Sequence, residues 1–290
     1  MKNGRHINPL FFLLPAGLVF LLFSLYPLYG AVKLAFFDYN VFSPAKFAAF
    51  ANFREMAAAP SFWNAAKNSF LYLIVTPALA AGSLLVAVLV NRKLRGINFF
   101  RTAYFLPVVI PMVIAGIAWK LILSDDTGIL NGLLMSAHII SKPIYWLTGA
   151  DLAIFSVMFV TFWKGIGYYM VMFLTGLQSI PTNLYESAQV DGATDLYAFR
   201  RITLPLLKPY VLLVLILSSS AAIKVFDEVY IMTSGGPLRK SETLIYYMYN
   251  NALGDFPPRV GFACAVGLVI FAAAAGIALA NRFIMKGEER

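Results

Sequence analysis

One cation and several aromatic side chains lie inside a run of apolar residues. Lys164 is near the middle of the run 152–177, Tyr168 follows one helical turn later, and Tyr169 and Met172 are close by. An unpaired lysine at the centre of a bilayer costs at least about 2.5–3.5 kcal/mol, so it should face protein or water. These residues therefore indicate either the wall of a solute pathway or a structural cation, paired with a carboxylate of another subunit or stacked on an aromatic ring.

A second polar group occurs in the apolar run 209–232. Ser219 and Ser220 are at mid-depth, where hydroxyls can bond a polar solute, their own helix backbone or a neighbouring helix. Lys224 and Asp227 follow, and together with the next glutamate they have the spacing at which charges on a helix neutralise one another. We treat all four residues as candidates for a solute pathway, with helix packing as the alternative.

The sequence lacks the patterns of several catalytic and energy-coupling sites. It contains no G-x-x-x-x-G-K-[ST] phosphate loop and no H-E-x-x-H. His6 and His138 have no Cys, His or carboxylate at metal-ligand spacing, and a single cysteine, Cys264, excludes an intrachain disulfide. We predict no catalytic residue, no metal and no cofactor bound by this chain.

The composition indicates a membrane protein. Of 290 residues, 60% are hydrophobic and 13% are charged, whereas a soluble domain has about 25% charged residues. The net charge of +9 is not gathered into a basic run interleaved with aromatics, so nucleic acid is not a predicted partner. The basic residues lie instead at the ends of apolar runs, as topology signals do. Lipid is therefore the expected surroundings of the chain.

Several apolar runs are near or above the roughly 20 residues that cross a bilayer as a helix. They are 9–36, 68–91, 102–123, 152–177, 209–232 and 260–284. The first is longer than the apolar core of a secretory signal and lacks a clear cleavage site, which indicates an uncleaved span. We predict an all-α integral membrane protein with six transmembrane helices and one domain over residues 1–290. Its first span precedes a five-helix core at about 68–284.

The charges in the short loops predict the orientation. With six spans, both termini share a side. That side would hold Arg92, Lys93, Arg95, Arg101, Arg200, Arg201, Lys208, Arg282, Lys286 and Arg290. The opposite, longer loops hold Lys46, Arg54, Lys67, Lys142, Arg239, Lys240 and Arg259. The positive-inside rule makes the first side cytoplasmic.

The longest polar stretch, 181–209, predicts a helix-turn-helix outside the bilayer. Pro181 suits the first turn of a helix, and Asp191-Gly192 interrupts that helix because glycine reaches backbone angles that other residues avoid. A second short amphipathic helix is expected to end before Pro205. By the charge rule this element is cytoplasmic, and its shape suits docking.

The same stretch resembles the EAA loop of ABC-importer permeases, which has the pattern Glu-Ala-Ala, three residues, Gly, nine residues, Ile-x-Leu-Pro. Only Ser187 departs from the pattern, replacing one small residue by another. The resemblance assigns coupling to an ATPase to Glu186, Ser187, Ala188, Asp191, Gly192, Ala193, Ile202, Leu204 and Pro205. Glu186 would contact the ATPase and Gly192 would form the turn. Ala188 and Ala193 would permit close approach, and the Ile-x-Leu-Pro residues would fix the loop to the fifth span.

Flanking motifs look like the carbohydrate-uptake branch of these permeases, the maltose and glycerol-phosphate type. They are Trp163-Lys164-Gly165-Ile166-Gly167-Tyr168-Tyr169-Met170, Gly176-Leu177-Gln178-Ser179-Ile180-Pro181, Phe226-Asp227-Glu228-Val229-Tyr230 and Thr233-Ser234-Gly235-Gly236-Pro237. The resemblance covers roughly 68–284 and implies a MetI-like permease core in the bacterial cytoplasmic membrane. It implies a subunit that moves a sugar or oligosaccharide and has no ATPase site of its own.

The resemblance also implies an assembly. Its parts would be a second permease, a different chain in the sugar branch, two ABC ATPase subunits that bind ATP and Mg, and a periplasmic or lipid-anchored binding protein. One alternative keeps this class with another cargo, such as glycerol phosphates, amino acids or polyamines. Another is a secondary transporter or an intramembrane enzyme. Against the latter, the spans hold no carboxylate chain for proton relay and no evident inverted repeat of broken helices.

Overall fold

The structure is a computed structural model that describes residues 10–92 and 95–286. The described chain is helical except for loops and one antiparallel pair of two-residue strands, β1 (Phe37–Asp38) and β2 (Lys46–Phe47), in which Phe37 faces Phe47. The all-α prediction is confirmed. Residues named above that lie outside the described ranges are His6, Lys93 and Arg290.

The backbone divides into two compact units, which are described separately. The first unit comprises the described parts of 1–59 and 248–271, and the second those of 60–247 and 272–290. α16 (Val260–Lys286) runs from one unit into the other.

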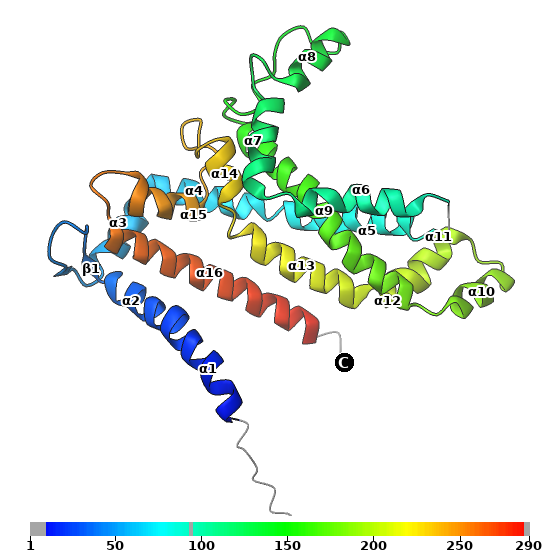
Figure 1. The fold of residues 1–290 in the computed structure, drawn as a ribbon, viewed down its shortest axis with the longest axis horizontal. Helices are drawn as coiled ribbons and strands as arrows, with labels where there is room; N and C mark the ends of the chain where they lie inside the picture. Colours follow the sequence, from blue (N-terminus) through cyan, green and yellow to red (C-terminus); the bar gives the residue numbers. More distant parts are fainter. Residues whose placement is uncertain (1–9, 93–94, 287–290) are drawn as a thin grey trace, which may run out of the picture. The chain divides into compact units, whose positions relative to one another are not determined.

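The first unit opens with an apolar helix that continues through a π-helical turn (Figure 1). Its elements are α1 (Leu10–Phe20), the π-helical turn Leu21–Leu25, α2 (Tyr26–Leu34), the β1–β2 pair, α3 (Ala51–Ala58), a second π-helical turn Asn250–Gly254, and the start of α16. The buried Asn52 donates from Nδ2 to the carbonyls of Ala35 and Phe37, at 2.9 Å each. These bonds fasten α3 to the hairpin, because both carbonyls lie at the junction of α2 and β1.

The second unit contains the remaining helices. They are α4 (Pro60–Tyr72), α5 (Val75–Val90), α6 (Ile97–Val109), α7 (Met112–Ile122), α8 (Ile129–Ser136), α9 (Ala153–Ser179), α10 (Thr182–Val190), α11 (Asp195–Ala198), the π-helical turn Phe199–Thr203, α12 (Leu204–Leu206), α13 (Lys208–Ala222), α14 (Asp227–Met232) and α15 (Leu244–Tyr249), whose end reaches the first unit.

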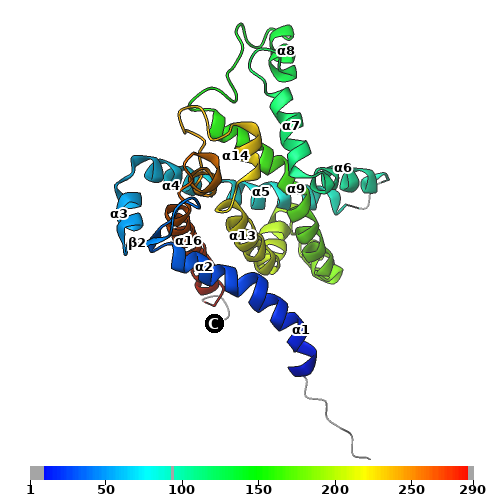
Figure 2. The same cartoon turned by 60° about the vertical axis from the view of Figure 1, so that its left-hand side comes forward.

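α5 and α9 form the centre of the second unit, and α13 packs against α5 while α6 packs against α9 (Figure 2). Close packing follows from small residues on α5 and α9. A Cβ at Gly82 would lie 3.0 Å from the ring of Phe162, and a Cβ at Gly167 would overlap the carbonyl of Tyr104 on α6. Small residues at such contacts are what helix association in lipid requires. The core beneath them is apolar, and it includes the fully buried Phe173.

Four helices are long and apolar enough to cross a membrane, or up to six if two bent pairs each count as one span. The four are Leu13–Leu34, Pro60–Val90, Ala153–Ser179 and Val260–Asn281. The bent pairs are Ile97–Val109 with Met112–Ile122, at 100°, and Asp195–Leu206 with Lys208–Ala222, at 63°.

Two predicted spans therefore differ from the structure. The run 102–123 breaks at Pro111, because a proline forces the preceding Ile110 into an extended conformation with ψ of 126° and ends α6. The run 209–232 is interrupted after Ala222, and a new short helix starts at Asp227.

Candidate functional site

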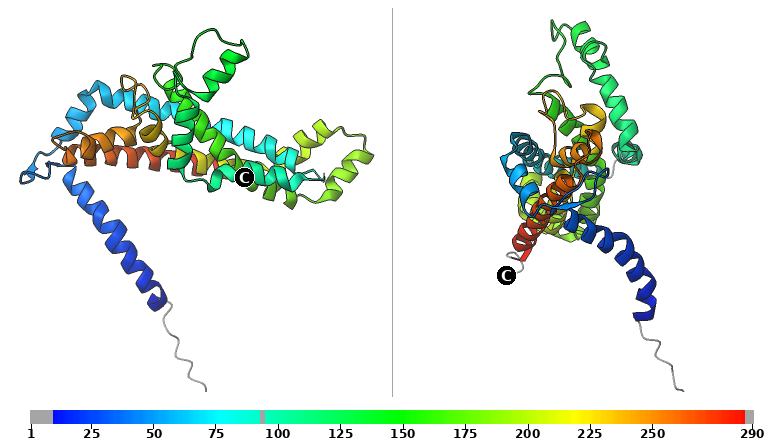
Figure 3. Two further views of the ribbon diagram at one scale, coloured as in Figure 1. Left: turned by 45° about the horizontal axis from the view of Figure 1, so that its top comes forward. Right: turned by 90° about the vertical axis from the view of Figure 1, so that its left-hand side faces the viewer.

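The stretch 181–209 forms the predicted helix-turn-helix, here called the elbow (Figure 3). α10 follows Pro181, and the chain turns at Gly192, which has a φ of +79°. The next helix starts at Thr194, whose Oγ1 accepts a hydrogen bond from the N–H of Tyr197 at 3.3 Å. A left-handed glycine after one helix and a threonine cap before the next are sufficient to make this turn locally.

The prediction that the second helix ends before Pro205 is wrong. The chain passes from α11 through a π-helical turn into α12, which contains Pro205, and α13 starts at Lys208. The N–H of Leu204 bonds to the carbonyl of Phe199, five residues back. Pro205 stands in the first turn of α12, where its missing N–H costs little, so the helical path continues.

The outer surface of the elbow is exposed. Glu186, Ser187, Asp191 and Gly192 are all exposed, and Val190 at the tip is 88% exposed.

The inner side of the elbow faces the rest of the second unit across a cavity of about 260 Å³. Ala188 and Ala193 line this cavity together with Thr203. The Tyr185 hydroxyl lies 2.8 Å from Thr203 Oγ1 and joins α10 to the end of the π-helical turn. Of the Ile-x-Leu-Pro residues, Ile202 is half-buried against the apolar core, whereas Leu204 and Pro205 are exposed.

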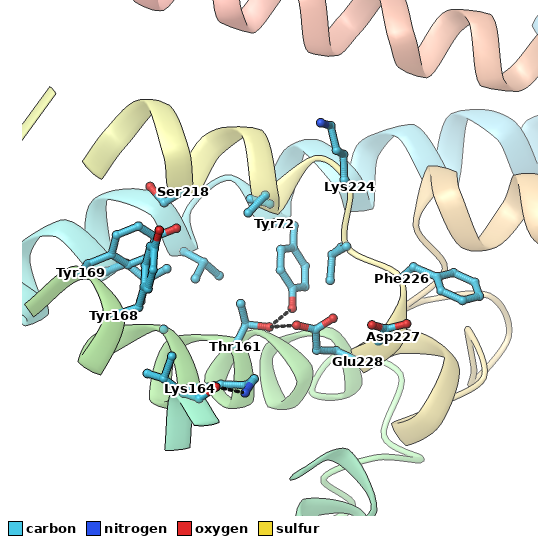
Figure 4. Close-up of a pocket in the computed structure, with 17 residues that line it drawn as sticks. Tyr72, Thr161, Lys164, Tyr168, Tyr169, Ser218, Lys224, Phe226, Asp227 and Glu228 are labelled. Carbon is cyan, nitrogen blue, oxygen red and sulfur yellow. Dashed lines mark hydrogen bonds between the residues drawn. The ribbon is translucent and has the colours of Figure 1, made fainter. Parts of the chain in front are cut away.

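A second cavity, of about 330 Å³, lies in the middle of the second unit (Figure 4). We call it the central cavity. It is lined by Tyr72, Val75, Leu79, Val108, Thr161, Lys164, Gly165, Tyr168, Tyr169, Ser218, Ala221, Ala222, Lys224, Val225, Phe226, Asp227 and Glu228. Aromatic rings and polar groups thus share a wall built from α4, α5, α6, α9, α13, the segment before α14 and the first turn of α14.

Lys164 caps the broken end of α6. Its Nζ donates to the carbonyl of Pro107 at 2.9 Å, to that of Val108 at 3.3 Å, and to that of Ile110. The last carbonyls of a helix lack partners within the helix, and Pro111 provides no N–H to its neighbours. A cation at this position also meets the negative end of the α6 dipole. The cation that the sequence singled out is therefore bound to backbone, not to a carboxylate or a ring.

The glycines of α9 bring α6 within reach of this lysine. Gly165 and Gly167 are small residues in the aromatic part of the span, where they permit close helix approach. A Cβ at Gly165 would lie 2.9 Å from Leu79 Cδ2, and one at Gly167 would overlap Tyr104. A larger side chain at Gly167 would require α6 to move, whereas one at Gly165 would displace the end of the Leu79 side chain on α5.

A hydrogen-bonded chain of three side chains crosses the central cavity wall. The Tyr72 hydroxyl bonds to Thr161 Oγ1, and Thr161 Oγ1 lies 3.3 Å from Glu228 Oε1. Figure 4 shows these groups meeting between α9 and the start of α14. Sequence reasoning missed Tyr72 and Thr161 because they are separated by 89 positions and each resembles an ordinary residue of an apolar run.

The structure brings together part of the set predicted to line a pathway. Lys164, Tyr168, Tyr169, Lys224 and Asp227 line the central cavity. The remaining three, Met172, Ser219 and Ser220, are not among its lining residues in the described chain, and Ser218 lines it instead.

The contacts of Ser219, and of the charged residues that follow α13, differ from those that the sequence suggested. Ser219 Oγ accepts a hydrogen bond from Asn281 Nδ2 at 3.1 Å, which ties α13 to α16. Within the described residues, Lys224 makes no ion pair with Asp227 or Glu228. Helix α13 ends at Ala222, so the helical spacing that would pair these charges is lost.

The chain belongs to the family of binding-protein-dependent transport system inner membrane components, whose model matches residues 57–285. It is a multi-pass membrane protein of the MetI-like permease fold.

Several curated relatives match over most of the chain. The probable ABC transporter permease protein YurN of Bacillus subtilis is 35% identical over 100% of both chains. The lactose transport system permease protein LacF of Rhizobium radiobacter is 33% identical and covers 93% of this chain and 91% of its own. The trehalose/maltose transport system permease protein MalF of Thermococcus litoralis is 32% identical, with 89% and 87% covered.

A solved structure has the same fold. It is a chain of a bacterial ABC transporter involved in the import of the acidic polysaccharide alginate, with a TM-score of 0.83, 25% identity, and coverage of 96% of this chain and 95% of that chain. A second structure, of the alginate transporter in complex with an alginate pentasaccharide-bound periplasmic protein, has a TM-score of 0.80 and 26% identity, and covers 93% of this chain and 91% of that chain.

Proposed function

We propose that this chain is a permease subunit of an ATP-binding-cassette importer that moves a sugar or oligosaccharide across the bacterial cytoplasmic membrane. The observation that carries the proposal is the central cavity, in which tyrosines and hydrogen-bonding groups face one another in the membrane-spanning unit. Aromatic faces and polar groups at fixed positions are the usual components of a small-molecule site. The named cargoes of the relatives LacF and MalF, lactose and trehalose or maltose, support a carbohydrate.

The energy source in this proposal is a separate ATPase that docks on the elbow. Glu186 and Ser187 are exposed on α10 and available to a partner, while Gly192 makes the turn. Ala188 and Ala193 keep the inner side narrow, and the Ile-x-Leu-Pro residues connect the elbow to α13. Force on α10 would reach the rest of the unit through the helical path into α13 and through the hydrogen bond between the Tyr185 and Thr203 hydroxyls.

The rest of the assembly follows from the family. We propose a second permease, a different chain, two ATPase subunits that bind ATP and Mg, and a solute-binding protein in the periplasm or on a lipid anchor. The whole chain would act as one permease domain with the elbow and both termini in the cytoplasm. The periplasmic partner of the alginate importer supports a binding protein of that kind.

One observation favours a second cargo class. Lys224 lines the central cavity, is exposed, and makes no side-chain hydrogen bond or ion pair with any described residue. A free ammonium could bind a phosphate, so glycerol phosphates are the alternative solutes.

The test is uptake by the complete transporter with a panel of radiolabelled sugars, oligosaccharides and glycerol phosphates. We expect ATP-dependent uptake of at least one carbohydrate, and copurification of the chain with an ATPase that is lost when Glu186 is replaced by lysine. Uphill transport by the purified chain alone would overturn the proposal, because it would mean a secondary transporter.

A further inference from the structure

Two walls of the central cavity differ in the hydrogen bonds that they leave for a solute. On one wall, Lys164 has every donor occupied. An ammonium group has three N–H donors and no acceptor, and all three of Lys164 are used by the carbonyls of Pro107, Val108 and Ile110. A solute cannot take a hydrogen bond from this lysine unless the end of α6 loses one.

The carboxylates on the opposite wall are in a different situation. A carboxylate has about four acceptor positions. Thr161 donates to Glu228 Oε1, and no other side chain of the described residues donates to this carboxylate. Asp227 precedes it in the chain, is exposed, and also lines the cavity. This wall therefore presents acceptors that a solute with hydroxyl donors can satisfy.

The remaining cation does not balance these carboxylates at close range. Figure 4 shows the ammonium of Lys224 directed away from Asp227 and Glu228. The charge of Lys164 is partly offset by the end of α6, which carries about half a negative elementary charge. Thr161 therefore lies beside a carboxylate, Glu228, while the cation on the same helix, Lys164, is bound to backbone carbonyls.

We infer that Glu228 makes the central cavity selective for uncharged sugars with several hydroxyl groups, and against uronic acids and sugar phosphates. This inference rests on the proposed sugar cargo and adds the chemical class of that cargo. Glu228 would accept hydroxyl donors of the solute, and Thr161 would hold the carboxylate in place. An anionic solute would bring a like charge beside Glu228 and Asp227, which costs binding free energy.

The fold does not determine this selectivity. The alginate importer has a chain of the same fold and serves an acidic polysaccharide. In the present chain the selectivity has two sources. The N–H donors of Lys164 are bound to carbonyls of α6, and the carboxylate of Glu228 can still accept hydrogen bonds. Single substitutions can alter either one.

The test measures binding to the complete transporter in lipid nanodiscs without its binding protein, which would impose a preference of its own. The probes are a neutral glucose tetrasaccharide and the uronic acid tetrasaccharide of the same linkage, at millimolar concentration, followed by saturation-transfer NMR. We expect the wild type to bind the neutral probe at least about tenfold more tightly, because a like-charge contact costs more than the roughly 1.4 kcal/mol of a tenfold change.

Three variants locate the effect. Glu228→Gln keeps the shape and one acceptor but removes the charge, so it should reduce the preference by about tenfold. Lys224→Met removes the exposed cation of the same cavity and should widen the preference for the neutral probe, because the carboxylates then lose an opposing charge. Glu228→Asp keeps the charge and should retain the preference, which covers the case in which the glutamine variant fails to fold.

Equal binding of the two probes by the wild type would overturn the inference while the sugar cargo stands. A preference that survives in Glu228→Gln would overturn it as well. Failure of the wild type and every variant to bind either probe, together with uptake of glycerol phosphate alone, would overturn both the inference and the proposed sugar cargo.

Discussion

The elbow takes its shape from residues that are adjacent in sequence, whereas the central cavity takes its walls from segments as far apart as Tyr72 and Glu228. In the elbow, Gly192 and Thr194 form the turn, and most side chains on α10 are exposed. In the cavity, Lys164 reaches across to α6, and Thr161 reaches to α4 and to α14.

The two regions should therefore respond differently to substitution. A residue of the elbow has few neighbours, so a change there should act through the backbone and leave the rest of the unit folded. A residue of the cavity joins several helices, so a change there should alter stability as well as transport.

The largest effect is expected from Lys164→Met. This change removes three hydrogen bonds and leaves the carbonyls of Pro107, Val108 and Ile110 without their partner. Loss of hydrogen bonds to a charged group costs about 1.5–3 kcal/mol, so the thermal midpoint in detergent should fall clearly and uptake with it. Tyr168→Phe is the matched control on α9, since the Tyr168 hydroxyl has no hydrogen bond within the described residues. Equal thermal midpoints for the two variants would show that Lys164 has no structural role.

Gly192→Val should uncouple ATP hydrolysis from transport while leaving membrane insertion intact. No atom lies within 4 Å of a Cβ at this position, so the strain comes from the φ of +79° alone. A left-handed conformation costs a non-glycine residue roughly 1–2 kcal/mol, and a β-branched one the most. Gly192→Asn is the control, because asparagine tolerates this conformation. ATPase activity and uptake are measured together in proteoliposomes, and full transport by the valine variant would count against the coupling role of the elbow.

Thr161→Val should destabilise the second unit by about 1 kcal/mol, because it breaks the links to Tyr72 and Glu228 without changing the size of the side chain. Thr161→Ser keeps the hydroxyl and should behave like the wild type. The readouts are the thermal midpoint and the KM for uptake. A raised KM with an unchanged midpoint would show that Thr161 acts on the solute and not on the packing of α4 against α9.

The contrast also explains what the sequence could and could not predict. The first helix and the turn of the elbow were predictable, because Pro181, Asp191 and Gly192 determine them locally. The continuation of helix through Pro205 was missed because a π-helical turn has no sequence signal of its own. The importance of Lys164 was evident from its cost in an apolar run. Its partners were not, because they are backbone carbonyls that become available only where α6 breaks.

The smallest effect is expected from Ser219→Ala, which removes the acceptor for Asn281 and should cost roughly 0.5 kcal/mol. Ser220→Ala is the control, since Ser220 has no side-chain hydrogen bond among the described residues. Both serines were candidates for contact with the solute, yet neither lines the central cavity. If Ser219→Ala lowers the midpoint slightly and leaves KM unchanged, its hydroxyl serves the packing of α13 against α16. A change in KM for either variant would show that the solute path extends beyond the central cavity. In that case α13 would line the pathway at Ser219 or Ser220 as well as at Ser218.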